Sequence, residues 1–276
     1  MQIRVGYELI YNCPQPTPML LMLNIHHSRA PDLLIPDNII TDPIVPLRAY
    51  RDSLGNWCTR MVAPPGRTRI AGTALLRDSG LPDPVVPDAQ RHEIAELPDD
   101  VLQFLLGSRY CETDQLSNTA WALFGPIGSH QASSGWSLVQ AICNFVHQHI
   151  RFDYQQARPT RTAWDAYNER VGVCRDFAHL AITLCRCMNI PARYCTGYLG
   201  DVGIPPPYDV MDFASWFEAY LGGQWYTFDP RHNMPRIGRV LMAHGRDATD
   251  VAITTTFGPN VLTGFTVWYD EVQVPV

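Results

Sequence analysis

The stretch VGVCRDFAHLAITLCRCMNIPARY, residues 171–194, decides how this chain is expected to fold. Its apolar residues Phe177, Leu180, Ala181, Leu184 and Met188 recur at helical spacing, and Asn189 and Pro191 then stop the helix. Cys174 stands at the start of this predicted helix, two residues after Gly172. The sequence therefore predicts a helix with a cysteine at its N-terminus.

A cysteine at the N-terminus of a helix is a candidate nucleophile. Unpaired backbone N–H groups and the positive end of the helix dipole stabilise a thiolate, and Arg175 adds a positive charge. Gly172 lets the chain turn sharply and lets a substrate approach the backbone. The alternative is a structural cysteine, since free cysteines are among the most buried residues.

The segment FASWFEAYLGGQWYTFD, residues 213–229, predicts a β-hairpin with a two-residue turn at Gly222-Gly223. In that register Leu221 faces Gln224 and Trp216 faces Asp229. One side of the hairpin is then shared by Ala214, Trp216, Glu218, Thr227 and Asp229, and Ser215 points to the opposite side unless a bulge intervenes.

Other segments complete an α+β chain with two domains. Residues 137–154 predict a helix and ARYCTGYLG, residues 192–200, a strand. The first hundred residues contain short β-like runs separated by turn signals, which are typical of a β-sandwich-like domain. The glycine- and serine-rich residues 125–136 are interpreted as the boundary, so we expect a β-rich domain over 1–128 and a core domain over 129–276.

Composition narrows the classes of function. The 276-residue chain has a net charge of -6, which disfavours a nucleic-acid surface, and it contains no lysine. No apolar stretch predicts a membrane span, and the N-terminus does not resemble a secretory signal, so we expect a cytoplasmic protein. Its eight cysteines are expected to be mostly free thiols, with a disulfide framework as the weaker alternative. The spacing of Cys185, Cys187 and Cys195 matches no zinc motif, and no metal or cofactor is predicted.

The stretch around Cys174 and the segment FEAYLGGQWYTFDPRHN, residues 217–233, resemble the transglutaminase-like superfamily of bacterial cysteine proteases. The resemblance covers about residues 130–260 and implies a papain-like core, with an N-terminal β domain like that of many bacterial members. It also implies acyl transfer through a thioester. The family pattern places the nucleophile at Cys174, the orienting acid at Asp229 and the base at position 214.

Position 214 is an alanine, so the expected histidine is absent. His232, three residues after Asp229, is the candidate substitute base, and its alternative is a polar loop residue. His179 lies three residues from Asp176 and is more simply a structural histidine. His147 and His149 fit a helix end, where they complement the dipole, and His26-His27 show no partner pattern.

Two functions remain open from the sequence. The first is a cysteine amidase or protease in which Cys174, Asp229 and His232 act on an amide of a peptide or protein. The second is a peptide-binding module of the same fold, with catalysis impaired because Ala214 replaces the histidine. In either case the expected substrate groove includes Trp216, Arg175 and Gly172. The oligomeric state stays open.

Overall fold

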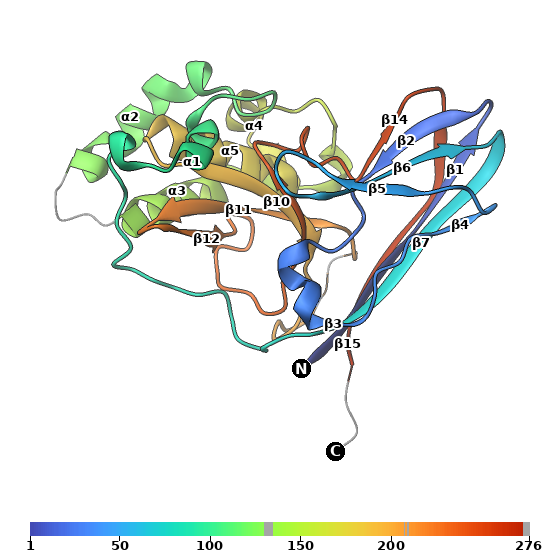
Figure 1. The fold of residues 1–276 in the computed structure, drawn as a ribbon. Coiled ribbons are helices and arrows are strands. Elements are labelled where there is room, and N and C mark those ends of the chain that lie inside the picture. Colours follow the sequence, from blue (N-terminus) through green and yellow to red (C-terminus); the bar gives the residue numbers. More distant parts are fainter. Residues whose placement is uncertain (130–134, 207, 209, 273–276) are drawn as a thin grey trace.

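The computed structural model describes residues 1–129, 135–206, 208 and 210–272, and it shows two parts lying side by side (Figure 1). One part is made of two antiparallel sheets, and the other packs helices on a third sheet. The strand order is β15-β1-β7-β3 in the first sheet, where β4 also pairs with β7, and β14-β2-β6-β5 in the second. These strands are β1 (Gln2–Cys13), β2 (Thr17–Leu21), β3 (Leu33–Ile35), β4 (Ile40–Asp42), β5 (Arg48–Arg51), β6 (Trp57–Ala63), β7 (Gly66–Arg77), β14 (Thr254–Thr256) and β15 (Val261–Val272).

The two sheets of the β-rich part share one apolar core. Along β1 the odd-numbered residues from Ile3 to Tyr11 are buried, as the period of a strand with one covered face requires. They join residues of β2, β6, β7 and β15 in one cluster, so side chains of the two sheets pack against each other. The predicted β-sandwich-like architecture is confirmed.

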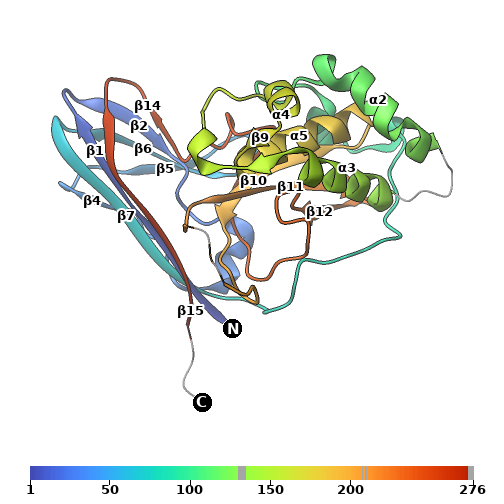
Figure 2. The ribbon, with the colours of Figure 1, turned by 180° about the vertical axis from the view of Figure 1, so that it is seen from behind.

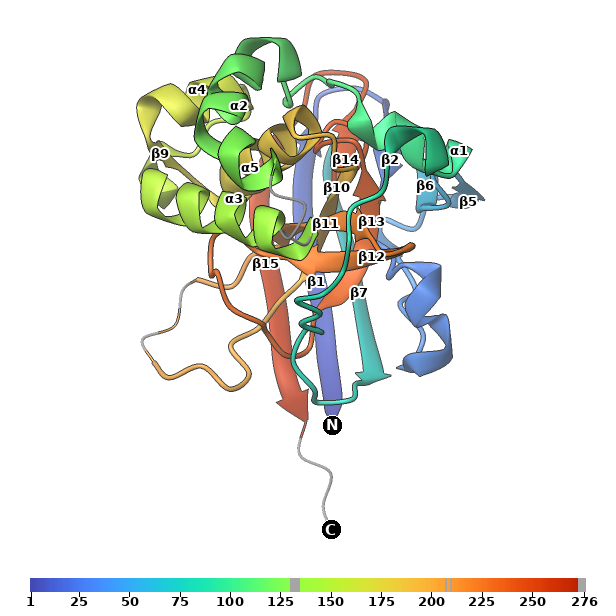
Figure 3. The same ribbon diagram turned by 90° about the vertical axis from the view of Figure 1, so that its left-hand side faces the viewer.

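The second part places helix α5 on an antiparallel sheet, with strand order β12-β11-β10-β13. Helices α2, α3 and α4 cover the other sides of α5, as Figure 3 shows, and Figure 2 shows these helices from the side opposite to that of Figure 1. The elements are α1 (Asp99–Leu102), α2 (Thr113–Ser129), α3 (Gly135–His149), β8 (Arg151–Phe152), α4 (Ala163–Glu169), β9 (Val171–Gly172), α5 (Cys174–Cys187), β10 (Ala192–Tyr198), β11 (Ala214–Leu221), β12 (Gln224–Phe228) and β13 (Val240–Gly245). Short 3-10 helices are η1 (His27–Asp32), η2 (Ile94–Glu96), η3 (Gln103–Leu105) and η4 (Tyr154–Gln156).

Helix α5 is the centre of this part. Its residues from Asp176 to Cys187 are all buried, and its apolar side chains share a cluster with residues of α2, α3 and β11. The predicted helix and its stop are both confirmed, since Asn189 has a φ of 61° and Pro191 follows. An antiparallel sheet with a central helix that begins at a cysteine is the expected papain-like core.

The predicted boundary between two consecutive domains needs a correction. Strand β15 pairs with β1 in antiparallel register, from Gln2 opposite Val272, and β14 pairs with β2. In addition, α2 packs on α5 and extends through residues 125–129, while residues 130–134 lie outside the described part. A cut at residue 128 therefore does not separate the parts, because β14 and β15 belong to the first two sheets.

The hairpin follows the predicted register. Leu221 pairs with Gln224 and Phe217 with Phe228, and Gly222 and Gly223 adopt φ angles of 55° and 84° in the turn. Phe217 joins the cluster around α5, so the odd-numbered residues of β11 face the helix. All eight cysteines are free thiols. Within the described ranges, none of the helices has the length and apolar character needed to cross a bilayer.

Candidate active site

Cys174 is the first residue of α5 and the one cysteine of the eight that is partly exposed. The turn before it depends on Gly172, where an added Cβ would lie 2.7 Å from the Cβ of Asp176. In the space that this glycine leaves, Asp176 Oδ2 accepts a hydrogen bond from the Val173 backbone N at 3.0 Å. Asp176 thus caps the helix and places the sulfur at its N-terminal end.

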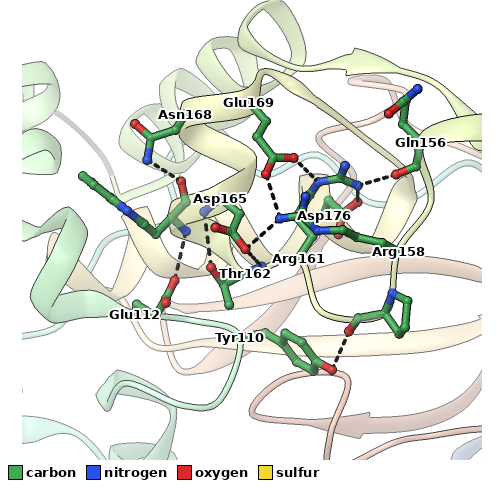
Figure 4. Close-up of polar contacts among 12 residues, drawn as sticks. Tyr110, Glu112, Gln156, Arg158, Arg161, Thr162, Asp165, Asn168, Glu169 and Asp176 are labelled. Carbon is green, nitrogen blue, oxygen red and sulfur yellow. Dashed lines mark hydrogen bonds and ion pairs between the residues drawn. The ribbon is translucent and has the colours of Figure 1, made fainter.

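A buried ion pair supports this cap. Arg161 Nη1 lies 3.1 Å from Asp176 Oδ2, and the two side chains are 2% and 0% exposed. Arg161 also binds Glu169 at 3.0 Å, and Arg158 reaches the same Glu169 from the outer side (Figure 4). Because Asp176 is paired with Arg161, it is not the partner of His179.

Asp229 and His232 form a second polar pair in the loop after β12. His232 Nδ1 lies 2.8 Å from Asp229 Oδ2, while Oδ1 accepts the backbone N–H groups of Arg231 and His232, both at 3.1 Å. Arg239 Nη2 binds the same Oδ2 at 2.9 Å. Burial alone would raise the pKa of the Asp229 carboxyl, but Arg239 and His232 hold it well below its usual range. Asp229 is therefore a carboxylate that orients the imidazole.

The loop that carries His232 is attached to α3. Asn233 has a φ of 52°, and its side chain bonds Gln140 and Asn144, each at 2.9 Å. His147 Nδ1 lies 2.9 Å from the Arg231 carbonyl oxygen. These bonds hold the backbone on both sides of His232, whose own side chain is 23% exposed. His147 has a structural role here, as the sequence indicated.

Two pockets meet at Cys174. The smaller, of about 40 Å³, is lined by Cys174, Ala214, Arg231 and His232 among others. The larger, of about 360 Å³, is lined by Cys174, Arg175, Tyr194 and Ser215, and also by Ile253 and Phe265 from the β-rich part. Cys174, Asp212, Phe213 and Ala214 line both pockets. The structure thus brings Cys174 and His232 to one cavity, beside the alanine at position 214.

The charge state of Cys174 depends on opposing effects. Burial raises the pKa of the thiol, and Asp212 acts in the same direction, while Ser215 and Arg231 lower it; the net shift is upward. The pKa of the Cys174 thiol is therefore raised although the residue stands at the N-terminus of α5.

Other expected site residues lie elsewhere. Arg175 lines the larger pocket as predicted, but Gly172 and Trp216 line neither pocket that contains Cys174. Gly172 instead makes room for Asp176, and the buried Trp216 lies beneath Arg239, whose guanidinium is 5.1 Å from its ring centre. The groove prediction is wrong for these two residues; for Trp216 the reason is that the even-numbered side of β11 faces away from α5.

The remaining histidines have structural surroundings. His179 is buried between Tyr110 and Tyr194, and its Nε2 accepts the Ala248 backbone N–H at 3.1 Å. His149 bonds the Tyr167 carbonyl oxygen at 2.7 Å. Across residues 1–129, 135–206, 208 and 210–272, no three His, Cys, Asp or Glu side chains are grouped to hold a metal ion.

Comparison with known proteins identifies the family of this fold. The family model of the transglutaminase-like superfamily matches residues 127–230. These residues form a transglutaminase-like domain. The matched segment includes Cys174 and Asp229 and ends two residues before His232.

Two relatives extend the comparison beyond the transglutaminase-like domain. The crystal structure of a putative cysteine protease from Cytophaga hutchinsonii is 29% identical, with a TM-score of 0.81 over 100% of this chain and 92% of that one. An uncharacterized protein of Mycobacterium leprae is 38% identical over 92 residues, which are 32% of this chain and 32% of that protein. The match thus spans about a third of that relative's length. The first similarity shows that both parts of the fold occur together in another protein.

Several residues around the candidate site were not found from the sequence. Arg239, which binds Asp229, and Tyr194, which lines the larger pocket, stand in other strands or loops with no motif. Ser215 was predicted on the side of the hairpin opposite to Ala214 and Asp229, and in the structure it lies beside Cys174. The alternation of side chains between the two sides of β11 was predicted correctly. The sequence did not show which of these two sides α5 covers.

Proposed function

We propose that the chain is a cysteine amidase or protease in which Cys174 is the nucleophile, His232 the base and Asp229 the orienting acid. The observation that carries the proposal is the 2.8 Å contact between His232 Nδ1 and Asp229 Oδ2, in a residue that lines a pocket with Cys174. This contact makes Nδ1 the protonated nitrogen, so Nε2 is left to exchange a proton with the thiol. The substrates are amides of peptides or proteins.

In the acylation half, His232 Nε2 takes the proton from the Cys174 thiol, and the sulfur attacks the amide carbonyl carbon. The resulting oxyanion is stabilised by donors at the start of α5, where the Cys174 backbone N–H has no partner within the helix, and by the nearby Ser215 hydroxyl. When the carbon–nitrogen bond breaks, the imidazolium gives its proton to the leaving amine. A thioester on Cys174 remains.

In the deacylation half, His232 takes a proton from water, whose oxygen attacks the thioester carbonyl. The carbon–sulfur bond then breaks, the acid is released, and the sulfur recovers its proton from His232. An amine that enters in place of water gives transfer instead of hydrolysis. Asp229 stays ionised throughout, because Arg239 and the loop N–H groups stabilise its charge.

We assign the two sides of the substrate to the two pockets. His232 must reach the leaving amine and then the attacking water, so the small pocket that it lines serves the leaving group. The larger pocket contains Cys174 without His232 and has apolar walls from Phe213, Ile253 and Phe265. This pocket fits the acyl group, and its volume is at the lower end for small-molecule sites.

Fluorogenic peptide amides test the proposal with four proteins: the wild type and three variants. Cys174→Ala should abolish turnover, and His232→Gln should lower kcat/KM by about 100- to 10,000-fold. His27→Gln, at an exposed histidine of the β-rich part, should leave kcat/KM unchanged. If His232→Gln retains full activity, His232 is not the base.

The same proteins distinguish the alternative of a peptide-binding module, for which Ala214 at the expected base position is the argument. Such a module would bind peptides, as measured by calorimetry, equally well in the wild-type protein and in the Cys174→Ala variant, and it would release no amine. That result would contradict the proposed enzyme.

A further inference from the structure

Nearly all charged side chains around Cys174 are paired with another charge. In the larger pocket, Arg158 binds Asp165 and Glu169, and Arg175 binds Asp176 at 3.4 Å. Arg175 also donates to the carbonyl oxygens of Arg158 and Pro159. Its positive charge is therefore already used within the protein, and it is not available to attract an anionic substrate.

In the smaller pocket, Arg236 and His232 each contact a carboxylate. Arg236 lies 3.3 Å from Asp201, and His232 lies 2.8 Å from Asp229. The guanidinium of Arg231 lies over the Phe152 ring, 3.9 Å from its centre. These contacts leave one acidic side chain of the two pockets to be explained.

That side chain is Asp212. Its Oδ1 accepts the backbone N–H of Phe213 at 2.6 Å, and no ion pair joins it to a cation among the described residues. It is half-buried and lines both pockets together with Cys174. Burial raises the pKa of its carboxyl, and the hydrogen bond from Phe213 only partly opposes this. An acid without a counter-ion at the junction of two pockets is unfavourable for the free protein.

A positively charged group on the substrate would remove this cost. A protonated amine supplies both the charge and the hydrogen-bond donors that the second oxygen of Asp212 lacks. The acyl group is the part of the substrate that occupies the larger pocket beside Asp212, if the proposed reaction holds. Since Asp212 and Cys174 line the same pocket, the amine must lie close to the reacting carbonyl.

We propose that Asp212 binds a primary ammonium group of the acyl part of the substrate, so that the preferred amides carry a cationic amine near the scissile carbonyl. This inference rests on the proposed function for the identity of the reacting bond. The α-ammonium of an N-terminal residue and a side-chain ammonium are the two sources of this chemistry.

Three coumaryl amides compare these sources. The alanyl amide has an α-ammonium, the Nα-acetylalanyl amide has no ammonium, and the Nα-acetyllysyl amide has only the side-chain ammonium. The wild-type protein should prefer an ammonium-bearing substrate to N-acetylalanyl by about 10- to 100-fold in kcat/KM, as expected for a charged hydrogen bond. Asp212→Asn should remove this preference by raising KM for the ammonium-bearing amides relative to the N-acetylalanyl amide, whose own kcat/KM reports any effect of Asp212 on the Cys174 thiol. Fast turnover of the alanyl amide indicates the α-ammonium, and fast turnover of the N-acetyllysyl amide the side chain. Equal turnover of all three by the wild-type protein would overturn the proposal.

A second measurement does not require amidase activity. Methanethiosulfonate reagents that carry a cationic aminoethyl group or an anionic sulfonatoethyl group modify accessible thiols. Comparison with the Cys174→Ala variant gives the share of the modification that occurs at Cys174. Asp212→Asn should lower the ratio of the cationic to the anionic rate at Cys174 by about 5- to 10-fold. Asp270→Asn, an equal change of charge at an exposed position of β15, should keep the wild-type ratio.

The two measurements separate the two proposals. If no amide is cleaved but the rate ratio depends on Asp212, the amidase proposal fails and the ammonium site stands. If amides are cleaved and neither the substrate preference nor the rate ratio changes in Asp212→Asn, the ammonium site fails and the amidase proposal stands.

Discussion

His232 Nδ1 lies 2.8 Å from Asp229 Oδ2, although the chain between them contains only Pro230 and Arg231. The turn is possible because Asp229 Oδ1 accepts the backbone N–H groups of both Arg231 and His232. One carboxylate thus folds the loop with one oxygen and orients the imidazole with the other. In the proposed mechanism, His232, which follows Asp229 in the chain, is the base. The family pattern assigns this role to position 214.

Asp229→Asn tests this double role. The amide can accept from the loop, but it no longer favours the Nδ1-protonated imidazole or balances the charge of Arg239. We expect kcat/KM to fall by about 100- to 10,000-fold with a smaller change in KM. Near-ultraviolet circular dichroism serves as the control for folding. A folded variant with wild-type kcat/KM would show that Asp229 does not orient the base.

The alkylation rate of Cys174 should report its raised pKa. Because burial raises the pKa of this thiol above its ordinary value, the rate with iodoacetamide should still be rising at pH 9. Ser215→Ala removes a group that lowers the pKa, and at pH 8 it should slow alkylation by about 3- to 10-fold. Thr196→Val, which changes a hydroxyl of the same pocket that bonds the Ala214 carbonyl oxygen, is the matched control. An inflection below pH 8 would contradict the prediction.

Arg161 should be essential for stability. Arg161→Met leaves the buried carboxylate of Asp176 without its main partner, and we expect the free energy of unfolding to fall by about 3–5 kcal/mol. Arg158→Met, which removes the exposed cation that also binds Glu169, should have a much smaller effect. Urea unfolding measures both. In a double-mutant cycle, Arg161→Met should cost less when Asp176 is already replaced by asparagine, and additive losses would argue against the pair.

Two histidines that lie between the β-rich part and the part around α5 should make the stability of the protein depend on pH. His26 and His244 lie with ring centres 5.1 Å apart, and His26 Nε2 and His244 Nδ1 are buried without hydrogen-bond partners in the described chain. Burial, with positive neighbours such as Arg193, lowers the pKa of His26 to about 4 and of His244 to about 3. Asp52 acts in the opposite direction on His26.

The sign of the effect follows from the direction of these shifts. As the pH falls below about 6.5, these histidines take up protons in the unfolded chain but stay neutral in the folded one. The free energy of unfolding should therefore decrease between about pH 6.5 and pH 4, by at most about 1.4 kcal/mol per pH unit for each histidine. His244→Gln should reduce the slope in urea titrations, and His92→Gln, near the hairpin turn, should not. An unchanged slope in His244→Gln would exclude this histidine as a source.

Much of the fold follows from local patterns. The helical period after Cys174, the stop at Asn189 and the turn at Gly222-Gly223 are properties of neighbouring residues, and each predicted the observed element. The long helix α2 was missed because Gly125 and Pro126 are common signals for a break. The return of β15 to β1 was missed because pairing over 266 residues leaves no local signal, as Arg4 opposite Asp270 illustrates.

By itself, the sequence determined Cys174 at the start of a helix, Asp229 at the end of a hairpin and the absence of histidine from position 214, because these depend on spacing along the chain. Only the tertiary structure decided that His232 turns back to Asp229 and shares a cavity with Cys174. It also decided that Ser215, not Trp216, lies beside the sulfur, and that Asp212 has no counter-ion among the described residues. The physical reason is that a pocket and its charge balance depend on which surfaces pack together, and here these come from α5, β11, the loop after β12 and β15.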